Sequence, residues 1–300
     1  MYRIGIDLGG TNTAAGLVDA QGRIVDRENV KTNLPTELDR IVGNMTWLCH
    51  TLLNRNGLTA ADVCSVGVGV PCTGNKQTGW MEDAHHLGFS GGPLVDRLKD
   101  ALCLPVFIEN DANAAAWGEY HAGNYDGDPF LLVTLGTGVG GGIIVGGEIL
   151  TGVNNAAGEF GHMVIDRNGP LCGCGRRGCF ELYGSATALV QSASRATGET
   201  ITEAKEVFRR AQAEDPVCKV VLDQYVTDLA DGLANLINIF GPAYLCIGGG
   251  VSHAGDALLK PLQEKLATRI FARDARQQPK IVLAKLHNDA GILGAALLNR

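Results

Sequence analysis

The feature that most constrains the fold is a strand followed by a glycine-rich turn and a second strand, because this unit occurs twice. The first copy leads into the turn Gly9-Gly10-Thr11, and the second leads into Gly136-Thr137-Gly138. In each copy an apolar strand precedes the turn and a return strand follows it. The repetition favours an α/β fold in which one supersecondary unit is used twice, with chance similarity between two glycine-rich hairpins as the alternative.

Strands and helices alternate along the rest of the chain. Apolar residues recur at helical spacing from Thr36 to Asn56, where Thr36 with Asp39 predicts the N-cap. The length of 300 residues suggests about two domains. We therefore place one lobe at residues 1–118 plus 289–300 and the other at residues 119–288, where the strand–turn–strand pattern begins again.

Charge and hydropathy exclude several classes of protein. The net charge is −7 and no long basic run occurs, so we expect no nucleic-acid partner. No apolar run approaches the roughly 18 residues of a membrane span, and no signal peptide is recognisable. Six of the nine cysteines are scattered, mostly among apolar neighbours, and three lie together beside a histidine. This distribution predicts a cytoplasmic protein with one metal site.

The glycine turns are candidate phosphate-binding loops. Backbone N–H groups can approach an anion closely at glycine, because no Cβ intervenes. Neither turn is followed by the Gly-Lys-Ser/Thr of a Walker loop, and strands rather than helices follow both turns. Turns that need a positive φ are the alternative. Two such loops facing each other across a cleft are typical of the two-lobed actin-like (ribonuclease H-like) ATPase fold, in which Asp7 would hold Mg²⁺ beside the triphosphate.

A histidine and three cysteines have the spacing of a metal site. His162 is followed by Cys172, Cys174 and Cys179, which together make a closed Cys₃His set. Such a set is typical of structural zinc, because it leaves no position for a reactive water. Free thiols or a disulfide are the alternatives.

Two carboxylates flank this predicted zinc loop. Glu159 precedes His162 by three residues, and Glu181 follows Cys179 by two. An ordered loop can fix both of them where a polyhydroxylated ligand needs acceptors. Solvated surface charges are the alternative.

A third polar group lies where an apolar strand ends and a helix begins. Asn110 and Asp111 occupy this junction, and helix capping is the simplest role for either. Capping needs only one residue, however, and ligands of α/β sheets usually bind at strand ends. We therefore predict that Asn110 and Asp111 contact a sugar and that Asp111 accepts the proton of the attacking hydroxyl.

These motifs together resemble those of the ROK family of sugar kinases and repressors, most closely its bacterial glucokinases. The resemblance runs along essentially the whole chain and is most diagnostic at the cysteine run after Gly161-His162. It implies transfer of the γ-phosphoryl group of Mg-ATP to the 6-hydroxyl of a hexose, and a homodimer or homotetramer. It also implies sugar contacts and nucleotide contacts.

The implied sugar contacts are Asn110, Asp111, Glu159, His162 and Glu181. The implied nucleotide contacts are Asp7, Gly9, Gly10, Thr11, Asn12, Thr137, Gly138, Gly249 and Gly250.

Two departures from the family pattern leave the hexose open. Cys72 stands where many glucokinases have glycine, and His86 stands where many have asparagine. Glucose is the leading substrate, with N-acetylmannosamine, N-acetylglucosamine, fructose and allose as alternatives. A repressor lacking its DNA-binding domain, or a phosphoryl donor such as polyphosphate, is disfavoured by the acidic balance and the absence of a basic track.

Overall fold

The computed structural model describes residues 1–299, apart from the side chain of His86, and it divides into two compact units. The first unit comprises Met1–Tyr125, Ile149–Ala157 and Lys285–Arg300, and the second comprises Asp126–Glu148 and Gly158–Ala284. Arg300, the last residue of the predicted first lobe, lies outside the described residues.

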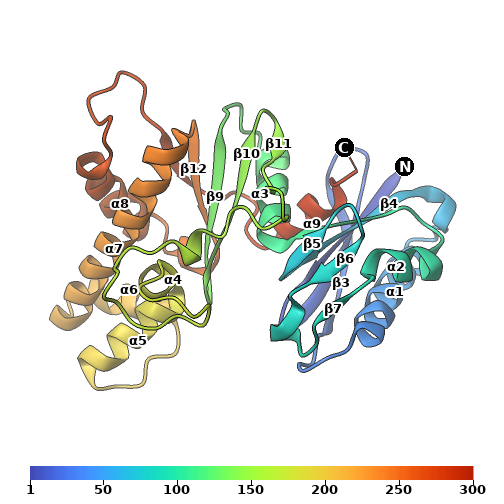
Figure 1. The fold of residues 1–300 in the computed structure, drawn as a ribbon, viewed down its shortest axis with the longest axis horizontal. Coiled ribbons are helices and arrows are strands. Elements are labelled where there is room, and N and C mark those ends of the chain that lie inside the picture. Colours follow the sequence, from blue (N-terminus) through green and yellow to red (C-terminus); the bar gives the residue numbers. More distant parts are fainter. Residues whose placement is uncertain (300) are drawn as a thin grey trace. The chain divides into compact units, whose positions relative to one another are not determined.

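The first unit is built on a five-stranded sheet with the order β3-β2-β1-β4-β8 (Figure 1). Its strands are β1 (Tyr2–Leu8), β2 (Asn12–Val18), β3 (Ile24–Lys31), β4 (Val63–Val70) and β8 (Val106–Asn110). Its helices are α1 (Leu38–Arg55), α2 (Leu94–Leu102), α3 (Asp111–Ala122) and α9 (Asp289–Ala296). A small antiparallel sheet also belongs to this unit, made of β5 (Thr73–Asn75), β6 (Trp80–Glu82) and β7 (Gly91–Gly92).

Helices cover both faces of the first sheet, as the alternation of side chains along a strand requires. On β2, Leu17 belongs to the apolar cluster that includes α1, whereas its neighbour Val18 packs with Leu293 and Ala296 of α9. Helix α9 also packs closely against α3. A Cβ atom on Gly294 would lie 1.6 Å from the carbonyl oxygen of Ala114, so only glycine permits this approach of the two helices.

The second unit is built on a sheet with the order β11-β10-β9-β12-β13. Its strands are β9 (Phe130–Leu135), β10 (Val139–Val145), β11 (Glu148–Ile149), β12 (Tyr244–Gly248) and β13 (Lys280–Leu283). Its helices are α4 (Glu181–Gly184), α5 (Ala186–Thr197), α6 (Ala204–Gln212), α7 (Pro216–Phe240) and α8 (Asp256–Arg269).

The two sheets repeat one topology, which confirms the predicted duplication. In each, an antiparallel hairpin joins the first two strands across a glycine turn, with Leu8 paired to Thr13 in one sheet and Leu135 to Val139 in the other. In each, the first strand then pairs in parallel with a later strand, β4 or β12. Because the order of strands is the same, the two glycine turns occupy equivalent positions in their own sheets.

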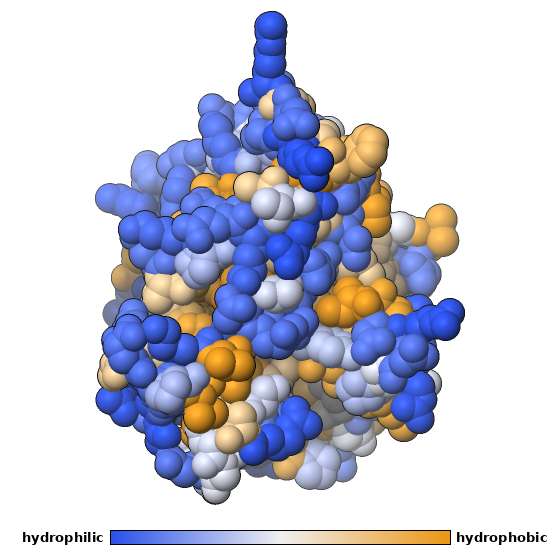
Figure 2. All heavy atoms as spheres, turned by 90° about the vertical axis from the view of Figure 1, so that its left-hand side faces the viewer, coloured by the Kyte–Doolittle hydropathy of each residue, from blue (hydrophilic) through white to orange (hydrophobic). Residues whose placement is uncertain are grey.

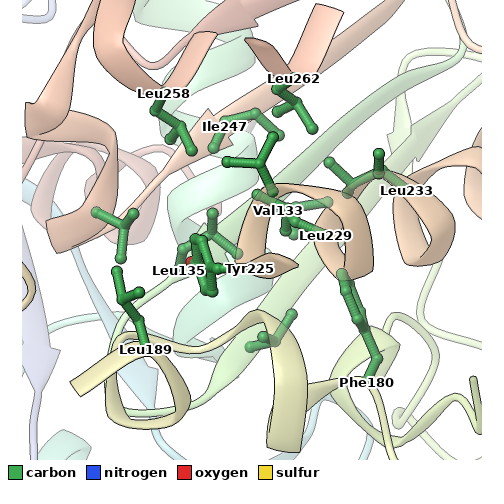
Figure 3. Packing of buried hydrophobic residues seen from close by; sticks show 14 of the residues in the cluster. Val133, Leu135, Phe180, Leu189, Tyr225, Leu229, Leu233, Ile247, Leu258 and Leu262 are labelled. Carbon is green, nitrogen blue, oxygen red and sulfur yellow. The ribbon is translucent and has the colours of Figure 1, made fainter. Parts of the chain in front are cut away.

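The core of the second unit joins the sheet to the segment beside the predicted zinc loop. Leu131, Val133 and Leu135 project from one face of β9 into a cluster with residues of α5, α7 and α8. Figure 3 shows Phe180, which follows Cys179 and is fully buried, at the edge of this cluster near Leu233. Burial of Phe180 therefore anchors the neighbouring Glu181 to the core.

On the face shown in Figure 2, hydrophilic residues predominate and hydrophobic ones occur in separate patches among them. Within residues 1–299, no helix combines the length and the apolar character needed to cross a bilayer.

The contact between α3 and α9 gives the first testable prediction. Gly294→Ala should lower the free energy of unfolding by about 1–3 kcal/mol, because the added methyl group collides with the backbone of α3. Gly43→Ala in α1 is the matched control, since a Cβ there meets nothing within 4 Å. It should raise stability by about 0.5–1 kcal/mol through helix propensity. Chemical denaturation of both variants measures the difference, and equal effects would contradict this account of the contact.

Candidate active site and metal centre

The first glycine turn is closed by one backbone and one side-chain hydrogen bond and is exposed at its tip. The N–H of Gly9 donates to the carbonyl of Asn12 at 3.0 Å, and the hydroxyl of Thr32 donates to the carbonyl of Gly9 at 2.7 Å. Gly10, Thr11 and Asn12 are exposed. The turn thus has a fixed shape with its tip in solvent, as a phosphate-binding loop requires.

Asp7 lies at the end of β1, directly before this turn. Burial raises the pKa of its carboxyl group above the ordinary value. Its carboxylate oxygen lies against Gly291 of α9, where a Cβ would approach it to 2.9 Å. A cation beside the carboxylate would favour its ionised form, so Asp7 fits the predicted Mg²⁺ role by its chemistry.

At the junction of β8 and α3, Asn110 performs the capping. Its side-chain oxygen accepts from the N–H groups of Ala112 and Asn113 at 2.9 and 3.1 Å. Its amide nitrogen donates to the carbonyl of Cys72 at 3.3 Å. One amide hydrogen of Asn110 is left by these bonds for a ligand. The Asp111 carboxylate accepts from the N–H of Ala112 at 2.7 Å and is half-buried at the first position of the helix.

The structure reveals a buried carboxylate behind this junction that sequence reasoning did not single out. Glu109 is fully buried, and it accepts from the N–H of Asn110 at 2.9 Å and from the Asn113 amide at 3.1 Å. Its other oxygen forms an ion pair with Lys76 at 2.5 Å. Glu109 therefore fixes Asn110 and Asn113, the residues that flank Asp111 and Ala112. Glu109 directly precedes Asn110 and Asp111 in the sequence, which could have indicated a role for it. Nothing in the sequence indicated Lys76 as its partner.

Of the two residues that depart from the family pattern, Cys72 and His86, the structure describes the side chain of Cys72. Cys72 is buried, and this burial, with a smaller contribution from the nearby Asp111, raises the pKa of its thiol to about 12. The thiol is therefore neutral at physiological pH. The side chain of His86 lies outside the described part of the structure.

The second glycine turn is held by the segment that follows the cysteine run. The N–H of Ala186 donates to the carbonyl of Gly136, and the hydroxyl of Thr187 donates to the carbonyl of Thr137, both at 2.8 Å. The N–H of Val139 donates to the Glu181 carboxylate at 3.2 Å. A predicted sugar contact thus lies directly on a predicted phosphate loop.

The third glycine turn, after β12, borders a groove. Gly249 has φ +79°, and a Cβ there would lie 2.5 Å from the carbonyl oxygen of Leu135, so glycine is required. A groove of about 250 Å³ adjoins Gly250, between α6 and the short helix η4 (Gly250–Ala254). Its lining includes Lys205, Phe208, Arg209, Gln212 and His253. The four side chains from α6 could not be expected from the glycine turn, because α6 is distant along the chain, whereas His253 follows Gly250 by three residues.

The four predicted metal ligands gather in one cluster. The potential ligand atoms of His162, Cys172, Cys174 and Cys179 lie within 4.8 Å of one another, as a shared metal ion would require. Nδ1 of His162 lies 3.8 Å from the sulfur of Cys172, so Nε2 is the ring nitrogen left for a ligand or another partner. The donor set fits structural zinc in both number and kind.

The loop around this cluster joins the two segments that carry the predicted sugar contacts. The N–H of Cys172 donates to the carbonyl of Arg176 at 2.7 Å, which closes the loop on itself. The N–H of Phe180 donates to the carbonyl of Met163 at 2.7 Å and so links the neighbours of Glu181 and His162. Glu159 is exposed and precedes the short helix η3 (Phe160–His162). The roles of these carboxylates stay predictions.

The ionisation of the thiols depends on their surroundings. A hydrogen bond from the backbone of Arg176 lowers the pKa of Cys174, whereas burial raises the pKa of Cys179 to about 12. Zinc binds the thiolate form and drives such groups to deprotonate. Zinc binding at Cys179 would therefore have to overcome the effect of burial on this thiol.

Comparison with known proteins extends the similarity over both units. A model of the ROK family matches residues 3–300. The chain is 37% identical to the glucokinase of Halalkalibacterium halodurans, over 99% of this chain and 94% of that protein. It is 33% identical to an N-acetylmannosamine kinase of Escherichia coli, over 99% of this chain and 98% of that protein. A solved ROK family glucokinase from Streptomyces griseus, in complex with glucose and AMPPNP, has 35% identity and a TM-score of 0.83, covering 99% and 98% of the two chains.

The metal cluster gives the second prediction. The purified protein should contain about one zinc per chain, because four ligands close one site. Cys179→Ser should lose the metal and make the loop at residues 163–180 sensitive to protease, whereas Cys103→Ser, at an exposed cysteine outside the cluster, should keep it. Elemental analysis and limited proteolysis measure both effects. A Cys179→Ser variant with unchanged zinc content would contradict the assignment of ligands.

Proposed function

The chain belongs to the ROK family, and from this membership we propose that it phosphorylates glucose at the 6-hydroxyl. It is an ATP-dependent hexose kinase, as its similarity to glucokinases over nearly the full length of both chains indicates. The observation that carries the finer proposal is the pairing of a closed Cys₃His cluster with carboxylates on both sides of it. Glucose as the preferred hexose, and the role of each residue, are parts of the proposal.

The sugar is recognised by acceptors of the second unit. Glu159 and Glu181 accept hydrogen bonds from sugar hydroxyl groups, and each carboxylate can serve two adjacent hydroxyls. Nε2 of His162 bonds a further hydroxyl, because Nδ1 faces the cysteines. Zinc fixes the loop and takes no part in the chemistry.

In the first unit, Asp111 accepts the proton of the 6-hydroxyl as the oxygen attacks the γ-phosphorus. A placed base of this kind contributes a factor of roughly 10²–10⁴. The new O–P bond forms as the bond to the β-phosphate bridging oxygen breaks, and ADP leaves. Asn110 supports this step by capping α3 and by offering its remaining amide hydrogen to the sugar.

The phosphates are bound by backbone groups of the glycine turns. Gly9–Asn12 and Thr137–Gly138 donate N–H groups to the phosphate oxygens. Asp7 would hold Mg²⁺ or its waters beside the nucleotide, where the ion would neutralise the developing charge. The groove beside Gly249 and Gly250 offers Phe208 and polar side chains to the base of the nucleotide.

A second candidate function is phosphorylation of N-acetylmannosamine. The 33% identity to the Escherichia coli kinase supports it, and Cys72 borders the junction that carries Asp111. Location in the cytoplasm, a homodimer or homotetramer, and the absence of a nucleic-acid partner complete the proposal. The distribution of cysteines supports the cytoplasmic location. The acidic net charge supports the absence of a nucleic-acid partner.

The role of Asp111 gives the third prediction. Asp111→Asn should lower kcat by a factor of about 10²–10⁴ while the KM for glucose stays within about tenfold, because the base acts in the transition state. Asp96→Asn, an exposed carboxylate of α2 in the same unit, is the control and should keep the wild-type kcat. Steady-state kinetics measure both. If Asp111→Asn kept most of the wild-type kcat, Asp111 would not be the base.

A panel of substrates tests the fourth prediction. ADP release in a coupled assay should be fastest, by kcat/KM, with glucose among glucose, N-acetylmannosamine, N-acetylglucosamine, fructose and allose. ATP should serve better than polyphosphate as the donor. Preference for N-acetylmannosamine would select the second candidate, and failure of every hexose with Mg-ATP would refute the kinase.

A further inference from the structure

The carboxylate of Glu181 lies against the second glycine turn, at a distance that is possible only because Gly138 has no side chain. One carboxylate oxygen accepts from the N–H of Val139 at 3.2 Å. The same oxygen would lie 2.1 Å from a Cβ on Gly138, so the carboxylate fills the space that any larger residue would occupy. The turn predicted to bind phosphate therefore already carries an anion of its own chain.

The turn and the segment that carries Glu181 form one bonded assembly. The N–H of Ala186 donates to the carbonyl of Gly136, and the hydroxyl of Thr187 donates to the carbonyl of Thr137. The buried Phe180 fixes the other end of this segment in the core. The backbone of Glu181 is therefore held in place relative to the turn, and only its side chain is left to change position.

The charge of Glu181 opposes nucleotide binding at this turn. A carboxylate and a triphosphate repel each other, and burial weakens the screening between them, since Glu181 is half-buried. A sugar changes this balance, because its hydroxyl groups donate to the carboxylate and compete with the N–H of Val139. A carboxylate engaged by a sugar releases that N–H group and presents less of its charge to the turn.

We propose that Glu181 makes nucleotide binding depend on sugar binding: without sugar it occupies the second glycine turn, and with sugar it turns away and opens the turn to phosphate. This inference rests on the proposed function, because it takes Glu181 as a sugar contact. Thermodynamic linkage then requires the nucleotide to raise the affinity for sugar by the same factor. The enzyme would thus bind ATP well only when a hexose is present to accept its phosphate.

Calorimetric titration with Mg-AMPPNP tests the coupling. In the wild-type protein, saturating glucose should tighten nucleotide binding by about tenfold, within the usual range for coupled sites. Glu181→Gln keeps an acceptor for Val139 and removes the charge, so it should bind the nucleotide without sugar about fivefold or more tightly than the wild type does. Glu181→Ala should act in the same direction, because it removes both the charge and the hydrogen bond.

Glu264→Gln is the matched control, because Glu264 is an exposed carboxylate of α8 in the same unit and belongs to neither the proposed sugar contacts nor the glycine turns. Its affinity for the nucleotide without sugar should equal that of the wild type. Zinc content and circular dichroism verify that each variant is folded, and the wild-type coupling is measured whether or not a variant folds.

The outcomes separate this inference from the proposed function. If glucose and nucleotide both bind but neither Glu181 variant changes the sugar-free nucleotide affinity, the turn merely orients Glu181 and the inference is wrong. Wild-type nucleotide affinity that is independent of glucose would refute it as well. If glucose does not bind at all, the proposed function fails, and the inference fails with it.

Discussion

Both units depend on backbone approaching its neighbours more closely than a side chain would allow. In the first unit, Gly294 brings α9 against the carbonyl of Ala114 in α3. In the second, Gly138 leaves space for a carboxylate on the turn. At both positions the absence of a side chain is what permits the contact.

The metal cluster and the second glycine turn act on the same short segment from opposite sides. The cluster ends at Cys179, the core holds Phe180, and the turn accepts Glu181. A metal without a catalytic role can therefore influence both sugar recognition and the state of a phosphate loop. The proposed chemistry separates into two tasks, since Asp111 of the first unit handles the proton while the second unit holds the sugar and part of the nucleotide.

Local patterns made much of this predictable. The strand–turn–strand unit that occurs twice depends on residues close in sequence, and the structure confirms it. The gathering of His162 with the three cysteines also depends on a short segment, and the structure shows it. The predicted cap of α1 was wrong, because the helix begins after Glu37 and the Thr36 N–H donates instead to the carbonyl of Leu87. Two contacts could not be predicted because they join distant segments: the ion pair of Lys76 with Glu109, and the bond of Glu181 to Val139, 42 residues away. Tertiary packing, rather than any local pattern, brings these residues together.

The central claim is transfer of phosphate to one hydroxyl group of a hexose. A correlation spectrum between ¹H and ³¹P, recorded after incubation with glucose and Mg-ATP, identifies the phosphorylated carbon directly. The account predicts a phosphoester whose phosphorus couples to the two protons on carbon 6. Coupling to a proton on any other carbon, or no phosphoester at all, would contradict it.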